Sequence, residues 1–149
     1  MAHFRVATFM NASPERVWKL LADWEGSAAW MVDATSVVVL GEQREGVGTR
    51  VRAVTRIAGI ALTDVMTVTA WEPGRRLEVF HEGRPIHGPA WFALTPHEGG
   101  TRFEWVEDLI PPLGRLGEIG GRVLRAPIEA VLRKSLMKLK RLAEQSASS

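Results

Sequence analysis

The chain has 149 residues, of which 46% are hydrophobic and 24% are charged, and its formal net charge at pH 7 is +2. This composition excludes extensive disorder, and the length fits one domain over residues 1–145 followed by a disordered polar tail over 146–149. The absence of cysteine excludes disulfides, thiolate chemistry and cysteine-based zinc sites. No apolar run approaches the roughly 20 residues that cross a bilayer, and no signal peptide is recognisable, so we expect a cytoplasmic protein.

The N-terminal part of the sequence predicts one strand followed by two short helices. Residues 3–10 alternate between apolar and polar side chains, as a half-buried strand does. Ser13 is a suitable N-cap and Pro14 fits the first helical position, which predicts a short helix that ends near Ala22. A second helical turn is expected over residues 24–30.

The middle of the chain is dominated by strand-like segments. Short turns rich in glycine and proline separate these segments, which indicates an antiparallel meander. The six expected strands lie near residues 35–42, 49–58, 61–71, 75–82, 87–96 and 101–109.

The C-terminal segment, from Leu113 onward, has the apolar spacing of a long helix, and Pro127 should kink it. This segment is basic, because residues 113–149 contain 8 Lys or Arg and 3 Asp or Glu, whereas residues 1–112 contain 11 and 14. Such a segment is either the solvated face of an amphipathic helix or a surface for phosphates or an anionic membrane. The basic field is too weak for nucleic-acid binding, and no stable membrane insertion is expected.

One strand, a helical connection, six antiparallel strands and a long helix predict an α+β fold with a curved sheet around the helix, and an apolar cavity between them. The motifs SPERVWKLLADW, GVGTRVR, WEPGRRLEV, LTPHEGGTRFEW and LMKLKRLAE resemble the START-like/Bet v 1-like (SRPBCC) superfamily, and within it the bacterial polyketide cyclase/dehydrase and lipid-transport family. The resemblance covers residues 3–145. It implies the helix-grip fold, with seven strands, two short helices after the first strand and a long C-terminal helix.

The family resemblance implies one of two functions. The first is binding of a hydrophobic small molecule, such as a lipid, a polyketide or an aromatic metabolite. The second is catalysis by a polyketide cyclase, aromatase or dehydratase. Strand alternation and helix spacing predict the apolar side chains that line the cavity: Val51, Ala53, Met66, Val68, Leu77, Val79, Phe92, Leu94, Phe103, Trp105, Ile119, Val123 and Ile128.

Three polar residues share strand faces with these apolar side chains and are the candidate catalytic residues: Glu107, His81 and Asp64. A carboxylate in an apolar pocket has a raised pKa, and a histidine there can act as acid or base, which suits proton transfer at an enolisable polyketide carbon. The alternative is that each lies at a strand end, partly solvated. No nucleophilic triad, phosphate loop, dinucleotide motif or metal-ligand spacing is present, so neither a cofactor nor a metal is expected.

The aromatic composition is unusual, with six tryptophans and no tyrosine. Tryptophan and phenylalanine offer stacking surfaces but few hydroxyl donors, which favours an apolar or aromatic ligand over a sugar or nucleotide. Strict alternation places Trp71 and Trp91 on the outer face of the sheet, where a second copy in a homodimer could cover them. A single bulge would exchange inside and outside for the residues that follow it.

Overall fold

The computed structural model describes residues 2–57, 59–83, 86–110 and 113–145. The predicted tail over 146–149 lies outside the described residues, and the division into one domain stays a prediction. The elements follow in the order β1 (Ala2–Met10), α1 (Pro14–Ala22), the 3-10 helix η1 (Glu25–Ala29), β2 (Ala34–Leu40), β3 (Arg50–Ile57), β4 (Ile60–Glu72), β5 (Arg76–Glu82), β6 (His87–His97), β7 (Gly100–Leu109), α2 (Gly114–Val123) and α3 (Arg125–Gln145).

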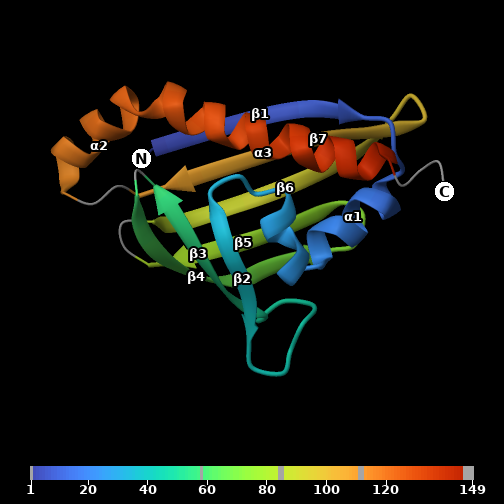
Figure 1. Ribbon diagram of the computed structural model, residues 1–149, viewed down its shortest axis with the longest axis horizontal. Coiled ribbons are helices and arrows are strands. Elements are labelled where there is room, and N and C mark those ends of the chain that lie inside the picture. The colour runs from blue at the N-terminus through green and yellow to red at the C-terminus, as the bar shows by residue number, and fades with distance from the viewer. Residues whose placement is uncertain (1, 58, 84–85, 111–112, 146–149) are drawn as a thin grey trace.

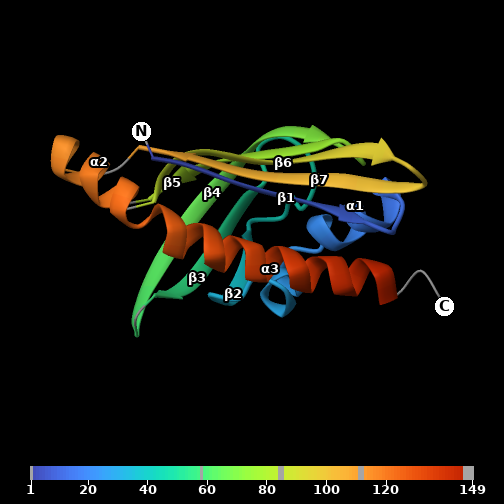
Figure 2. The same ribbon diagram turned by 90° about the horizontal axis from the view of Figure 1, so that it is seen from above.

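The strands form a seven-stranded sheet in the order β1-β7-β6-β5-β4-β3-β2, and every neighbouring pair is antiparallel. The sheet curves, and α3 crosses its concave side (Figures 1 and 2). Inward side chains of the sheet and of α1 and α3 form a hydrophobic core. The predicted α+β helix-grip fold, with its meander and its two short helices after β1, is therefore confirmed.

Helix α1 begins where the sequence predicts. The Ser13 hydroxyl oxygen accepts a hydrogen bond of 3.2 Å from the Arg16 backbone N–H, and Pro14 occupies the first turn. Val17, Trp18 and Leu21 are buried on one side of the helix. Leu21 follows Val17 by four residues and Trp18 by three, so all three side chains lie on one apolar face of the helix, toward the core.

A bulge in β4 changes the predicted positions of the tryptophans. The pairing of β4 with β5 shifts between Val68 and Ala70, so one extra residue is inserted and Trp71 pairs with Leu77. Trp71 is packed against the core, and its ring lies edge-on to that of Trp18, with 5.1 Å between the two ring centroids. The prediction that Trp71 faces outward is wrong, and with it the idea that a second copy covers this residue.

The C-terminal segment forms two helices where the sequence predicts one bent helix. The proline ring at Pro127 would collide with the carbonyl group four residues earlier, at Val123, if the helix continued unbroken. The chain accordingly breaks at Leu124, and Pro127 lies in the first turn of α3, where its missing N–H is not needed. Helix α3 then packs along β1, whereas α2 extends past the end of the sheet (Figures 1 and 2).

Candidate functional site

The three polar residues singled out from the sequence meet inside the protein. Asp64 lies on β4, His81 on β5 and Glu107 on β7, and each shares the inward face of its strand with buried apolar residues. The exposed fraction of the side chain is 7% for Asp64, 7% for His81 and 15% for Glu107. We call these three residues the acid–histidine cluster.

Two small residues on β6 allow the cluster to form. His81 pairs with Gly88, and Ala90 pairs with Glu107, so β6 lies between the histidine and the glutamate. A side chain longer than a methyl group at these inward positions would occupy the space that the two polar groups share. Gly88 also has a φ of +128°, and a Cβ atom there would lie 2.7 Å from the carbonyl oxygen of Asp108, so this position requires glycine.

The imidazole ring of His81 is held between two carboxylates. Its Nδ1 lies 2.8 Å from Oδ2 and 3.0 Å from Oδ1 of Asp64, and its Nε2 lies 3.2 Å from Oε2 of Glu107. The Nδ1–H donates to Asp64, while Nε2 is close to Glu107 without an aligned hydrogen bond and has no other partner. One ring nitrogen is therefore fixed, and the other keeps its capacity to bond a further acceptor.

The carboxylates keep the histidine positively charged. Burial by itself lowers the pKa of His81, but the close negative charge of Glu107 and the hydrogen bond to the Asp64 carboxylate outweigh burial and raise this pKa to about 10. At neutral pH the ring is thus an imidazolium with both nitrogens protonated. It can act as a hydrogen-bond donor or an acid, but it is not a free base.

Aromatic side chains surround the glutamate of the cluster. The Trp105 indole N–H donates a hydrogen bond of 3.2 Å to Oε1 of Glu107, which orients that carboxylate. The centroid of the Trp105 ring lies 6.0 Å from that of Trp30 and 5.2 Å from that of Phe92. Trp30 is 1% exposed, and its indole N–H has no hydrogen-bond partner. A second buried donor without a partner thus belongs to the aromatic group next to the cluster.

Sequence reasoning missed one further acidic residue, Asp33, which precedes β2. Burial raises its pKa, a backbone hydrogen bond opposes this effect, and the charge of Glu107 raises it further. The interaction with Glu107 brings Asp33 into the electrostatic surroundings of the cluster. Asp33 lies in a connecting segment, where no strand or helix periodicity predicts the direction of a side chain. The only sequence feature that could have indicated its burial is its position directly after the hydrophobic run from Trp30 to Val32.

The predicted lining residues divide into two groups. Those on the sheet face inward, eight of them buried and two half-buried, and Ile128 on α3 is half-buried against the core. Ile119 and Val123 are instead 57% and 72% exposed, so the prediction that they line a cavity is wrong. Both lie on α2, and the break at Leu124 directs this helix away from the concave face. The residues on the sheet are Val51, Ala53, Met66, Val68, Leu77, Val79, Phe92, Leu94, Phe103 and Trp105.

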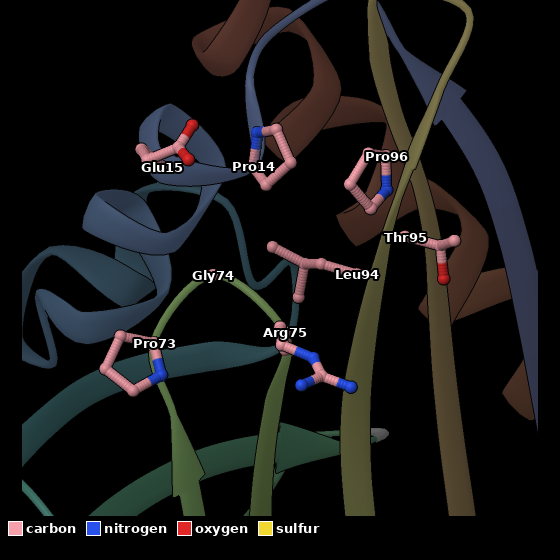
Figure 3. Close-up of a pocket in the computed structure, with 8 residues that line it drawn as sticks. All are labelled: Pro14, Glu15, Pro73, Gly74, Arg75, Leu94, Thr95 and Pro96. Carbon is pink, nitrogen blue, oxygen red and sulfur yellow. The ribbon is translucent and has the colours of Figure 1, made fainter.

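The described residues line at least two hollows on the surface. One, of about 370 Å³, lies where the start of α1 meets the β4–β5 turn and the end of β6, between Pro14, Gly74 and Pro96 (Figure 3). The other, of about 420 Å³, lies on the outer side of α3. Only Leu94 of the predicted lining residues borders either of them.

Two further observations concern metals and membranes. Within residues 2–57, 59–83, 86–110 and 113–145, no group of histidine, aspartate and glutamate side chains has an arrangement that could hold a metal ion. No helix among those same residues is long and apolar enough to cross a membrane.

Solved structures of the same fold match almost the whole chain. A protein from Thermus thermophilus, TTHA0849, has a TM-score of 0.81 at 21% identity and covers 99% of both chains. The Zhui aromatase/cyclase from Streptomyces sp. R1128 has a TM-score of 0.72 at 21% identity, covering 98% of this chain and 93% of that one. A START superfamily protein from Mycobacterium smegmatis has a TM-score of 0.77 at 16% identity, covering 96% and 97%.

At these identities the structural likeness shows the fold alone. No curated protein sequence matches the chain. A family model described as polyketide cyclase/dehydrase and lipid transport, however, matches residues 1–144. The chain therefore belongs to the polyketide cyclase/dehydrase and lipid-transport family.

Proposed function

We propose that the protein binds an apolar or aromatic small molecule that carries a hydrogen-bond acceptor, between the concave face of the sheet and α3. The acid–histidine cluster would hold the acceptor. The observation that carries this proposal is a pair of buried donors beside Phe92 and Trp105. The Nε2–H of His81 lies 3.2 Å from Glu107 without an aligned hydrogen bond, and the indole N–H of Trp30 has no hydrogen-bond partner. Buried donors of this kind are costly unless a partner is supplied.

The ligand would enter by displacing side chains that are already loosely covered. Met66 and Phe92 are half-buried on the inward face, whereas their neighbours on the same face are buried. Their movement, together with that of α3, would open space beside the cluster. Trp30 and Trp105 would then offer flat apolar surfaces for stacking, which suits aromatic or lipid-like molecules. We extend the proposal to a cytoplasmic location, where such ligands need a carrier.

Binding can be tested without knowing the ligand. Native mass spectrometry of the purified protein, followed by denaturing extraction, should show a stoichiometric apolar adduct. The fluorescent probe 8-anilinonaphthalene-1-sulfonate supplies a second measurement, since it should bind and be displaced by an extracted adduct or by a long-chain fatty acid. A protein that carries no adduct and binds neither probe would contradict the proposal.

A matched pair of variants locates the site. Trp105→Phe removes the indole that orients Glu107, and we expect weaker binding of the same probe. Trp91→Phe makes the identical change on the outer face of the sheet, where the ring stacks on the Arg76 guanidinium at 4.9 Å, and should leave binding unchanged. Equal losses in both variants would place the ligand elsewhere.

The second candidate function is catalysis by a cyclase, aromatase or dehydratase. It is favoured by the contact of 3.2 Å between Nε2 of His81 and Glu107, which pairs an acid with a carboxylate inside an apolar site. Glu107 would remove a proton from the carbon between two carbonyl groups, the His81 imidazolium would stabilise the enolate oxygen, and Asp64 would orient the ring. The Zhui aromatase/cyclase, which has the same fold, supports this candidate.

Conservative variants separate the two functions. Glu107→Gln keeps the shape of the side chain but removes the base, so an enzyme would lose turnover of a poly-β-ketone analogue and keep its affinity. His81→Gln should weaken binding in either case, because it removes the cationic donor. Turnover by wild-type protein that persists in Glu107→Gln would exclude Glu107 as the base.

A further inference from the structure

Helix α2 presents apolar side chains to solvent. The exposed fraction is 80% for Leu113, 72% for Leu116, 57% for Ile119 and 72% for Val123, and α2 has no buried residue. At 100° per residue Leu116, Ile119 and Val123 lie along one side of the helix, and Leu113 directly precedes it. We call these four exposed residues the α2 apolar face. A contiguous apolar surface of this kind on an otherwise ordinary protein indicates a contact surface.

Basic side chains border the α2 apolar face. At 100° per residue, Arg115 and Arg122 lie next to Ile119 on one edge of this face, followed by the acidic Glu118, whereas glycines occupy the opposite side. Arg125 follows at the start of α3. The basic character continues along α3, whose outer hollow has Val32 and Met137 as its apolar lining. The rest of that lining is cationic and consists of Arg133, Lys134, Lys138 and Arg141.

The helix is attached to the body of the protein by little contact. It touches the start of β1 and the start of α3, and a Cβ atom at Gly121 would lie 3.1 Å from the Cβ of Ala2. At its N-terminus Leu113 and Gly114 have φ values of 69° and 54°, so the chain turns sharply before the helix. Helix α2 lies at the end of the molecule, beyond the sheet (Figures 1 and 2). The side chains of its apolar face are exposed there.

We propose that α2 docks on an anionic lipid bilayer, lying in the interface with its apolar face among the acyl chains and its arginines at the phosphates. A helix with a separate apolar face, arginine on its polar face and little overall hydrophobicity has the properties of an interfacial helix. The arginine stems can lie along the apolar region while their guanidinium groups reach the headgroups. Ten residues are too few to span the bilayer, so the helix lies on it.

Charge argues for lipid over a second copy of the chain. Pairing two α2 apolar faces across a twofold axis would gather Arg115, Arg122 and Arg125 from both copies around one small patch, with only Glu118 from each to compensate. An anionic headgroup layer does not cause this repulsion, because it attracts each arginine electrostatically. The proposal is independent of the ligand site, although it would place the protein where apolar molecules are dissolved.

The test is co-sedimentation of the full chain with vesicles. We expect the protein to pellet with vesicles of phosphatidylcholine containing one third phosphatidylglycerol, and at least about tenfold less with phosphatidylcholine alone. Raising the salt to about 0.5 M should release most of it, because the charges lie at the surface. No pelleting with anionic vesicles at low salt would overturn the proposal.

Matched variants assign the effect to α2. Leu116→Gln with Ile119→Gln should lower the partition coefficient by about tenfold or more, because two exposed apolar groups lose their burial in lipid. Val47→Gln with Ile60→Gln is the control, since these residues are 63% and 64% exposed elsewhere on the surface. Circular dichroism and thermal melting verify that both remain folded. Equal partitioning of the two variants would overturn the role of α2.

A second pair tests the charge requirement. Arg115→Gln with Arg122→Gln should weaken binding to anionic vesicles by about tenfold and leave the weak binding to neutral vesicles unchanged. Light scattering tests the other occupant. A wild-type dimer that the Leu116 and Ile119 changes convert to a monomer, together with no vesicle binding, would show that a second copy covers the face and would overturn the proposal.

Discussion

The interior of the sheet and helix α2 depart from the ordinary distribution of residues in opposite directions. Around His81 the protein buries a cation and two carboxylates at positions that alternate with core residues. On α2 it exposes leucine, isoleucine and valine at positions with the spacing of a core helix. Soluble proteins usually bury apolar groups and expose charges, and the informative residues are those that do the reverse.

The contrast shows how differently the two regions are stabilised. The acid–histidine cluster depends on mutual contacts, since the His81 ring lies within 3.2 Å of a carboxylate on either side. Helix α2 depends on almost no tertiary contact, and its apolar face has no partner in the described structure. Changes in the first region should therefore affect stability strongly, and changes in the second should affect association instead.

The largest expected effect is the pH dependence caused by His81. Its pKa rises from 6.5 to about 10 on folding, so its stabilisation is complete below pH 6.5, declines as the pH rises and is lost above about pH 10. At about 1.4 kcal/mol per pKa unit, the free energy of unfolding should fall by roughly 5 kcal/mol across this interval. Urea unfolding at a series of pH values measures it.

The matched variants for this experiment are two histidine replacements. In His81→Gln the decline should disappear, because no titrating group remains at that position. In His97→Gln, which alters a side chain that is 56% exposed, the decline in the free energy of unfolding should persist. Parallel declines in wild type and His81→Gln would show that the cluster does not hold the histidine charged.

The next largest effect is expected from shortening a buried leucine on α3. Leu139 on α3 is 0% exposed, and Leu139→Ala should lower the free energy of unfolding by about 3 kcal/mol through lost burial and the cavity left behind. Thermal and urea unfolding both report this change. A loss below about 1 kcal/mol would mean that α3 is not packed as described.

A smaller effect is expected from filling the gap between His81 and Glu107. Ala90→Leu should cost about 2 kcal/mol, because the longer side chain has to separate the two polar groups. The pKa of His81, followed by the NMR shifts of its ring, should fall as Glu107 moves away. Ala93→Leu on the other face of β6 serves as the control, and an equal pKa change there would contradict the assignment.

The smallest effect completes the comparison between the helices. Leu116→Ala on α2 should change the free energy of unfolding by no more than about 0.5 kcal/mol, because the side chain is 72% exposed. A loss as large as that of Leu139→Ala would mean that α2 packs against the protein in solution and that its apolar face is not available for docking.

The sequence predicted the regular part of the fold well. Turn residues separate the strands, Ser13 and Pro14 mark the start of α1, and alternation identified the inward faces of β3, β5 and β7. These signals are local, because each depends on a few neighbouring side chains and the period of one element. The three polar candidates were found in the same way, by sharing a strand face with core residues.

The remaining features depend on contacts between distant segments. The bulge after Val68, which brings Trp71 inside, has no sequence signal comparable to a turn. The approach of His81 to Glu107 depends on small residues of a third strand, and Asp33 joins them from a connection. Helical spacing predicted an apolar face on this segment but not what lies against it, so Ile119 was expected to line the cavity.

The break at Leu124 has a consequence for how the sequence can vary. Upstream of it, α2 shares no buried side chain with the body, so apart from Gly121, which lies against Ala2, a substitution there has only to preserve an amphipathic outline. Downstream, α3 has to match the shape of its neighbours residue by residue at Leu132, Leu136 and Leu139. The break at Leu124 thus separates α2, whose sequence is weakly constrained by packing, from α3, whose sequence is strongly constrained. Helix α2 could be replaced as a unit without redesigning the core.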